Sequence, residues 1–300
     1  MISVLLAIYH PNWEWLDELL HSLNEQTYPN LTLDVLDDSA DNTIFLELQE
    51  RLKHQIVRFP YRIRANDWNC GSNKTFESLT KEACGEYLAY CDQDDIWRPN
   101  KIAELYDAIE DAQMAYCDMS VIGPRGESIA PHLKSIRPRL QYVSGDHLED
   151  RYAFANCTAG CSMLIRRDIA LAAVPFPADT VYDQWLCLTA AHFGKLVFLP
   201  KTLVRYRQHA DNQTGILSGI KTKEDYYKKR VLPAVDRVEE FNRRFGATKE
   251  ILSFAEARQQ RRIFEIWKYR RFCKKDAYFE IAMKFIPERL FRTLICEIRR

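Results

Sequence analysis

Apolar and polar stretches alternate regularly over roughly the first 115 residues of the chain. Between the strand-like runs, apolar residues recur three and four positions apart, as on one face of a helix, beginning with Leu16, Leu19 and Leu20. Strands that alternate with helices predict a mostly parallel sheet with helices on both faces, an α/β fold. The predicted strands of this part are Ser3–Tyr9, Leu31–Leu36, Ile56–Ile63 and Glu86–Cys91.

The pattern loosens beyond this region. Residues 131–156 read as irregular loop, and from about Ile220 onward we expect helices alone. The remaining predicted elements are two short strands around a Gly/Pro turn in "MAYCDMSVIGPRGESI", a strand and a helix in "GCSMLIRRDIALAAV", a helix in "TVYDQWLCLTAAHFG", and strands in "KLVFLP" and "LVRYRQH". We therefore expect an α/β domain over residues 1–218 and a helical region over residues 219–300.

Polar clusters follow each of the four predicted strands of the first part. In open parallel sheets, ligands bind beyond the carboxyl ends of the strands, so these clusters are expected to share a site. The clusters are Tyr9–His10, Asp37–Asp38, Asn66–Gly71 and Asp92–Asp95.

The most acidic cluster lies in "YLAYCDQDDIW", directly after an apolar strand. In an extended segment Asp92 and Asp94 point the same way, with Gln93 opposite. Two carboxylates on one side suit a hard divalent cation such as Mg²⁺ or Mn²⁺, whose charge offsets their mutual repulsion. The alternative is a solvated acidic turn in which Asp95 bonds backbone amides.

A glycine precedes a predicted helix start in "GSNKTFE". Gly71 would let an anion approach the helix N-terminus, and Lys74 would add a positive charge. The segment has neither a P-loop nor a GxGxxG pattern, so the signal is weak, and Lys74 is equally explained as a solvated side chain.

Two later polar residues stand in contexts that suit chemistry. Asp183 lies near a helix start between Tyr182 and Trp185; aromatic neighbours would raise the pKa of this carboxyl and make it a usable general base. Its alternative role is a helix cap. His209 follows a strand and would ligate a metal or contact phosphate, unless it is structural. Arg207 would compensate a diphosphate.

Composition narrows the class of protein. With 47% hydrophobic and 28% charged residues, the chain reads as globular. No apolar run approaches the roughly 20 residues of a membrane-spanning helix, and the start lacks a basic leader, so a cytoplasmic location is expected. The nine cysteines are odd in number, and several lie in apolar runs, Cys84 among them. We expect buried, reduced thiols rather than disulfides or a zinc site.

Charge is distributed unevenly. The chain has zero net charge, but residues 258–300 contain 13 Lys and Arg against 5 Asp and Glu, a net charge of +8. Aromatic residues are interleaved with these cations. Such a helical region suits an anionic membrane surface; the alternative is a solvated helical face packed on the core.

Taken in order, the stretches "SVLLAIYH", "DVLDDSADNT", "NCGSNKTFE", "YLAYCDQDDIW", "CTAGCSMLIRR", "YDQWLCLTAAHFGKLVFL" and "YRQHADNQTG" resemble a known family. The chain resembles a family-two glycosyltransferase with the GT-A fold, in particular the bacterial rhamnosyltransferase-like subgroup, over roughly residues 1–215. The resemblance implies a Rossmann-like, mostly parallel nucleotide-sugar-binding domain. It does not cover the C-terminal helices.

The resemblance implies roles for several residues. Asp92 and Asp94 match the DxD motif, which holds Mg²⁺ or Mn²⁺ against the donor diphosphate, and His209 matches a position that meets the metal or the diphosphate. Asp183 matches the catalytic base. The residues implied near the nucleotide are Tyr9 and Asp38 by the base, with Gly71, Lys74 and Asp92. Two departures, Tyr9-His10 in place of a Tyr-Asn pair and a shortened "DDSAD", leave the details of base contact open.

The implied reaction is a single inverting displacement. The donor is dTDP-rhamnose or a UDP-hexose, and the acceptor is a hydroxyl of a growing or lipid-linked bacterial glycan; no nucleic-acid partner is expected. Asp183 would take the proton of the acceptor hydroxyl. Two other classes stay open: a sugar nucleotidyltransferase, although "AIYHPNWEW" lacks its Gly-rich basic loop, and a non-catalytic nucleotide-sugar-binding module.

Overall fold

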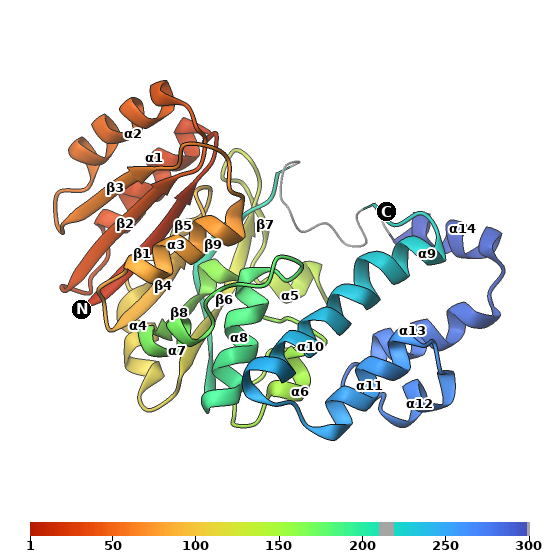
Figure 1. Ribbon diagram of the computed structural model, residues 1–300. Coiled ribbons are helices and arrows are strands. Elements are labelled where there is room, and N and C mark those ends of the chain that lie inside the picture. The colour runs from red at the N-terminus through yellow and green to blue at the C-terminus, as the bar shows by residue number, and fades with distance from the viewer. Residues whose placement is uncertain (210–218, 299–300) are drawn as a thin grey trace. The chain divides into compact units, whose positions relative to one another are not determined.

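The computed structural model describes residues 1–209 and 219–298, which belong to two compact units (Figure 1). The sheet unit comprises Met1–Leu148, Cys157–Phe176 and Val181–His209. The helical unit comprises Glu149–Asn156, Pro177–Thr180 and the described residues beyond 209. The polar loop expected after His209, and with it the chain leading to the expected boundary at residue 218, lies outside the described residues.

The strands of the sheet unit form one nine-stranded sheet in the order β3-β2-β1-β4-β8-β6-β9-β5, with β7 paired to β6. The four predicted N-terminal strands are present and parallel, at β1 (Ile2–Ile8), β2 (Leu31–Asp37), β3 (Tyr61–Ala65) and β4 (Tyr87–Cys91). The third begins later than predicted, because residues 56–60 lie outside the strand. The expected α/β class with a mostly parallel sheet is confirmed.

The other half of the sheet is mixed in direction. It contains β5 (Ile96–Trp97), β6 (Met114–Ile122), β7 (Ser128–Ala130), β8 (Met163–Arg166) and β9 (Leu196–Arg207). The strand β8 runs antiparallel to both β4 and β6. The prediction of separate strands in "KLVFLP" and "LVRYRQH" was wrong, because β9 is continuous. Its pairing with β6 shifts register around Asp118, which accommodates the residues near Pro200 as a bulge.

Helices cover both faces of the sheet. On one face, α1 (Trp13–Asn24), α2 (Asn42–Gln55) and α4 (Lys101–Ile109) share a buried apolar cluster with the strands. The other face carries α3 (Ser72–Glu82), α7 (Arg167–Ala172) and α8 (Tyr182–Phe193). Of these helices, α7 contacts both α3 and α8. Two short turns complete the unit, α5 (Leu133–Ile136) and η1 (Gly160–Ser162).

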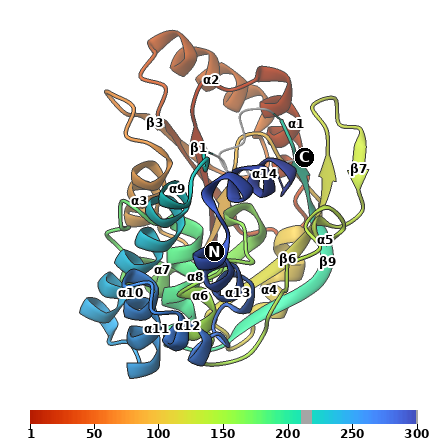
Figure 2. The same cartoon turned by 90° about the vertical axis from the view of Figure 1, so that its right-hand side faces the viewer.

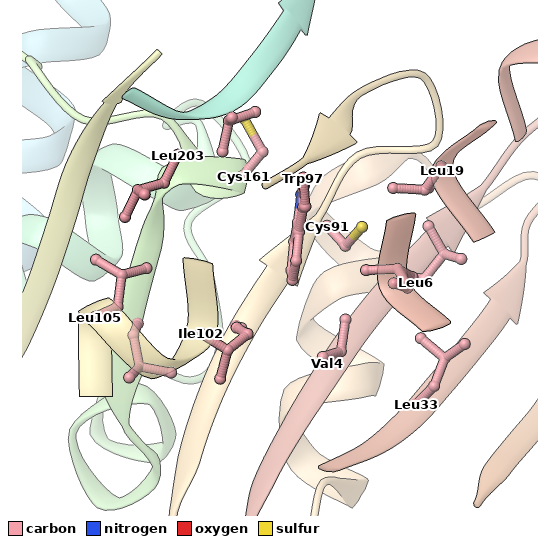
Figure 3. Close-up of a cluster of buried hydrophobic side chains, with 14 of the residues drawn as sticks. Val4, Leu6, Leu19, Leu33, Cys91, Trp97, Ile102, Leu105, Cys161 and Leu203 are labelled. Carbon is pink, nitrogen blue, oxygen red and sulfur yellow. The ribbon is translucent and has the colours of Figure 1, made fainter. Parts of the chain in front are cut away.

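The main apolar cluster lies beneath the polar strand ends. Leu6 of β1 and Leu19 of α1 belong to it together with Ile102 and Leu105 of α4, and Trp97 stands between these groups in Figure 3. All nine cysteines are free thiols, as expected. Most are buried, but Cys84 is exposed and was wrongly placed in the interior.

The helical unit contains helices only, in agreement with the prediction for its described residues. Its helices α10 and α11 pack as an antiparallel hairpin (Figures 1 and 2). Within the described chain, no helix has the length and apolar character needed to cross a membrane. The elements are α6 (Glu149–Tyr152), α9 (Lys223–Tyr226), a π-helical turn (Tyr227–Val231), α10 (Leu232–Phe245), α11 (Lys249–Gln259), α12 (Ile263–Lys268), α13 (Lys274–Phe285) and α14 (Glu288–Ile298).

Candidate active site

The acidic turn, Asp92–Asp95, connects β4 to β5 at the carboxyl end of the central parallel strands. Its backbone turns rather than continuing as an extended strand. The Gln93 side chain binds the end of β1: its Oε1 accepts from the Tyr9 amide at 2.8 Å and its Nε2 donates to the Tyr9 carbonyl at 2.9 Å. Gln93 thus fixes two of the predicted strand ends to each other.

The carboxylates of the acidic turn have different partners. Asp94 lies 2.7 Å from Nε2 of His209, so the structure brings these two predicted metal ligands together. Asp95 is fully buried and accepts from the Arg207 amide at 3.0 Å. Asp92 lies beside Asp95, since ligand atoms of Asp92, Asp95 and Cys161 all lie within 4.8 Å of one another. The backbone-amide bond of the alternative reading is thus present at Asp95, but this carboxylate is buried rather than solvated.

Burial dominates the electrostatics of this cluster. It raises the pKa of Asp92 to about 7, and the charges of Asp94 and Asp183 add to the effect. Burial, followed by Asp94 and Asp92, raises the pKa of Asp95 well above its usual range. The pKa of the Cys161 thiol is also raised well above normal by burial, so this thiol is neutral and a poor metal ligand.

Two buried cations stand behind the acidic turn. Arg207 is fully buried; its Nε donates to the Asp94 carbonyl at 2.9 Å and its guanidinium pairs with Glu18. The expected role of Arg207 in compensating a diphosphate is therefore not supported, because the side chain holds the turn from inside. Lys101 is also fully buried; its Nζ donates to the Cys161 carbonyl at 2.6 Å and lies 2.9 Å from the centre of the Trp97 ring. Desolvation lowers the pKa of Lys101 to about 8.

Sequence reasoning missed Lys101. One signal was available, because Lys101 precedes Leu105 by one helical turn and so shares the apolar stripe of α4. A lysine on a buried stripe indicates a compensated charge, since an isolated buried ammonium is costly.

The predicted base, Asp183, lies in the first turn of α8. It does not cap the helix, because the N-cap residue is Val181 and no side chain caps there. Tyr182 anchors this helix end: its amide donates to Oδ1 of Asn73 at 3.0 Å, and its ring packs against Phe76 with centroids 4.3 Å apart. Asp183 is consequently near enough to the acidic turn to raise the pKa of Asp92.

The loop from "CTAGC" makes room for that anchor. A Cβ atom on Gly160 would lie 1.9 Å from the Tyr182 hydroxyl oxygen, so only glycine is compatible with this packing. This segment thus contacts the residue at the start of α8.

Asp38 organises the predicted nucleotide-binding loop. Its Oδ1 accepts from the Asn66 amide group at 2.7 Å and from the Cys70 amide at 2.8 Å, and its Oδ2 accepts from the Gly71 amide at 2.8 Å. Gly71 adopts a φ of 80° at the N-terminus of α3, where glycine is favoured. The carboxylate therefore ties the loop to the end of β2.

Tyr9 and Lys74 complete the predicted set. Tyr9 is 49% exposed and packs edge-on against the ring of His10. Lys74 lies 3.0 Å from Glu77, a buried carboxylate that also binds Lys81. Lys74 is thus paired within its own helix.

The ligand types at this turn suit a divalent cation, since carboxylate oxygens and an imidazole nitrogen bind Mg²⁺ or Mn²⁺. Of the predicted metal ligands, Asp94 and His209 are in direct contact, whereas Asp92 is grouped with Asp95 and Cys161 in the described part of the chain. Burial, followed by the negative charges of Asp94 and Asp183, raises the pKa of Asp92, and a cation bound there would favour the ionised carboxylate.

Comparison with known proteins identifies the family. The model of "Glycosyl transferase family 2" matches residues 3–170. A similar relative is the dTDP-rhamnosyl transferase RfbG of Shigella flexneri, 25% identical over 222 residues, which are 70% of this chain and 73% of that protein.

Solved structures share the fold. S. aureus TarS 1–349 in complex with UDP-GlcNAc gives a TM-score of 0.61 at 17% identity, over 92% of this chain and 82% of that one. The mannosyltransferase PcManGT from Pyrobaculum calidifontis, in complex with GDP-Man and Mn²⁺, gives 0.58 at 15% identity, over 94% and 74%. Since the matched segment of the family model spans more than half of the chain, the protein belongs to glycosyl transferase family 2 and is a glycosyltransferase.

Proposed function

We propose that the protein transfers a sugar, with inversion, from a nucleoside-diphosphate sugar to a hydroxyl of a growing or lipid-linked bacterial glycan. The observation that carries this proposal is the placement of Asp183 beside the acidic turn, where its charge raises the pKa of Asp92. A proton acceptor and a cation-binding cluster in one place suit an attacking hydroxyl and a departing diphosphate. Residues 1–218 form the transferase domain in this proposal, and residues 219–300 a helical extension.

The donor is dTDP-rhamnose or a UDP-hexose. RfbG, a dTDP-rhamnosyl transferase by name, and TarS, solved with UDP-GlcNAc, support a donor of this kind. The base lies by Tyr9 and Asp38, with Gly71 and Lys74 nearby. Asp38 accepts from loop donors with three of the roughly four lone-pair positions of a carboxylate, which leaves one for the ring N–H of a uracil or thymine.

Asp94 and His209, with Asp92, hold Mg²⁺ or Mn²⁺ in this proposal; PcManGT was solved with Mn²⁺. The cation, when bound, offsets the negative charge that develops on the diphosphate leaving group. Because Arg207 and Lys101 are buried beneath the turn, their charges keep the carboxylates in place without reaching the donor.

Asp183 accepts the proton of the acceptor hydroxyl as the new glycosidic bond forms. The hydroxyl attacks the anomeric carbon from the face opposite the diphosphate, so one displacement inverts the configuration. The reaction needs no covalent enzyme intermediate, and the buried thiols of the chain remain unused.

The test is Asp183→Asn. We expect transfer to fall by about 10²–10⁴-fold, the usual contribution of a positioned base, while nucleotide affinity stays within about twofold. Asp168→Asn is the matched control, because it makes the same change in the first turn of the neighbouring helix α7. Near wild-type transfer by the Asp183 variant would show that another group takes the proton.

We further propose that the protein acts at the inner face of the cell membrane, through peripheral contact of the basic C-terminal region. The net charge of +8 over residues 258–300 supports attraction to an anionic surface.

A further inference from the structure

A cavity of about 390 Å³ lies entirely within the helical unit. Residues of α9, the π-helical turn, α11, α12 and α13 line it. Tyr227 and Val231 contribute from the π-helical turn, a rare conformation that concentrates at functional sites.

An incompletely bonded arginine lines this cavity. Arg258 is 3% exposed, and its Nη2 donates to Oε1 of Glu280 at 2.7 Å. Its Nη1 is also buried but has no hydrogen-bond partner among the described residues. The guanidinium of Arg258 therefore adds a buried positive charge to the wall of the cavity, only part of which is bonded to Glu280.

The charge of the lining selects an anion. Lys223, Arg261 and Lys284 line the cavity with Arg258, and Glu280, already bound to Arg258, is the sole acidic residue among them. Arg261 is paired with Glu224 and Lys223 donates to a backbone carbonyl. Lys284 is exposed and has no ion pair in the described part of the chain.

The apolar part of the lining selects a lipid over a simple anion. Ile263, Ile266 and Met283 line the cavity beside the cations. The neighbouring residues in the chain are large and exposed: Phe264 is 84% exposed and Phe285 is 71% exposed. Exposed aromatics next to a cationic cavity are typical of proteins that lie in a membrane interface.

We propose that this cavity binds the phosphate headgroup of an anionic lipid, with Phe264 and Phe285 in the interface. The phosphate oxygens accept from Lys284, and the positive charge of Arg258 in the cavity wall favours them. This assignment deepens the proposed membrane contact and rests on that part of the proposed function. Donor binding belongs to the sheet unit, so the two activities can be measured separately in one protein.

The experiment is co-sedimentation of the full chain with vesicles of phosphatidylglycerol or of phosphatidylcholine. We expect binding to the anionic vesicles alone. Met283→Trp fills the cavity without changing charge and should weaken binding at least tenfold. The control, Tyr278→Trp, also introduces a tryptophan on α13, at an exposed position outside the lining, and should bind as the wild type.

A second pair covers the case in which Met283→Trp does not fold. Lys284→Gln should lose more affinity, by about fivefold, than Lys274→Gln, which removes an exposed charge of the same helix outside the cavity. If the two variants of each pair lost the same vesicle affinity, the assignment of lipid binding to the cavity would be overturned. Diffuse attraction to the basic surface would then account for the binding.

Two competitors distinguish the ligand. Dihexanoyl phosphatidylglycerol should displace the vesicles at concentrations where inorganic phosphate does not; equal displacement by phosphate would overturn the lipid assignment. UDP-induced thermal stabilisation is measured in every variant. Its absence from the wild type, with vesicle binding intact, would count against the proposed transferase donor and not against the lipid site.

Discussion

Raising the pH should tighten the binding of Mn²⁺, because Asp92 holds a proton in the folded protein. Burial, followed by Asp94 and Asp183, raises the pKa of Asp92 from 3.8 to about 7. Protonated Asp92 therefore stabilises the folded state in full below a pH of about 3.8, and this stabilisation is lost as the pH rises through about 7. The shift corresponds to about 4 kcal/mol of folding free energy without metal, to the order of magnitude.

The same shift sets the size of the effect on metal binding. With a pKa of about 7, roughly one tenth of Asp92 is ionised at a pH of about 6 and roughly nine tenths at about 8. Mn²⁺ must displace the proton, so the apparent affinity should rise about tenfold over this interval, or about 1.4 kcal/mol. Calorimetry in two buffers of different ionisation enthalpy measures both the affinity and the protons released.

Two substitutions should move the midpoint of this pH dependence of Mn²⁺ affinity in opposite directions. Asp183→Asn removes a charge that raises the pKa of Asp92, so the midpoint should fall; Lys101→Met removes a charge that lowers it, so the midpoint should rise. The His209→Gln variant should retain the pH dependence of Mn²⁺ affinity. That result would assign the titration to the carboxyl of Asp92. A constant affinity across the interval, or shifts of the same sign in both charge variants, would refute the reasoning.

Two further predictions concern packing and a buried ion pair. Gly160→Ala places a methyl group 1.9 Å from the Tyr182 hydroxyl oxygen and must displace the tyrosine ring. Thermal unfolding should therefore show a loss of about 1–3 kcal/mol in the free energy of unfolding, and the rate of sugar transfer should fall. Unchanged transfer would contradict the role of Gly160 in supporting Tyr182. Arg258→Met leaves Glu280 buried without its cation, which should lower the free energy of unfolding in urea by about 3–5 kcal/mol. The double variant with Glu280→Met should recover most of this loss. Additive losses would argue against energetic coupling between Arg258 and Glu280.

Local pattern was sufficient for much of the fold. The alternation of apolar runs and helical stripes predicted β1 to β4 and the helices between them, because burial on one face or both leaves a period in the sequence. The acidic turn was placed correctly at a strand end for the same reason. Even β9 was recognised as strand-forming, although its continuity depends on a bulge against β6 that no single segment reveals.

Contacts between distant segments escaped prediction. Asn73 binds the amide of Tyr182 across 109 positions, and Gly160 admits the same tyrosine from a third segment. Such contacts are specified by tertiary packing, so no spacing rule exposes them. Arg207 was misread for a related reason: its type suggested a phosphate ligand, and only its depth in the fold showed that it binds the turn from inside.

The charges of the acidic turn fall into two groups by depth. Asp95 is fully buried, bound to the Arg207 amide and accompanied by the buried ammonium of Lys101, whose charge acts on it. Asp92 and Asp94 are half-buried. In the proposed site, the buried ammonium of Lys101 accompanies the inner carboxylate, which does not meet solvent, whereas the outer pair serves a cation that arrives with the diphosphate. Under the proposed function, a single carboxylate accompanied by Lys101 would have no charge left to recruit that cation, and we infer that three carboxylates end this strand for that reason.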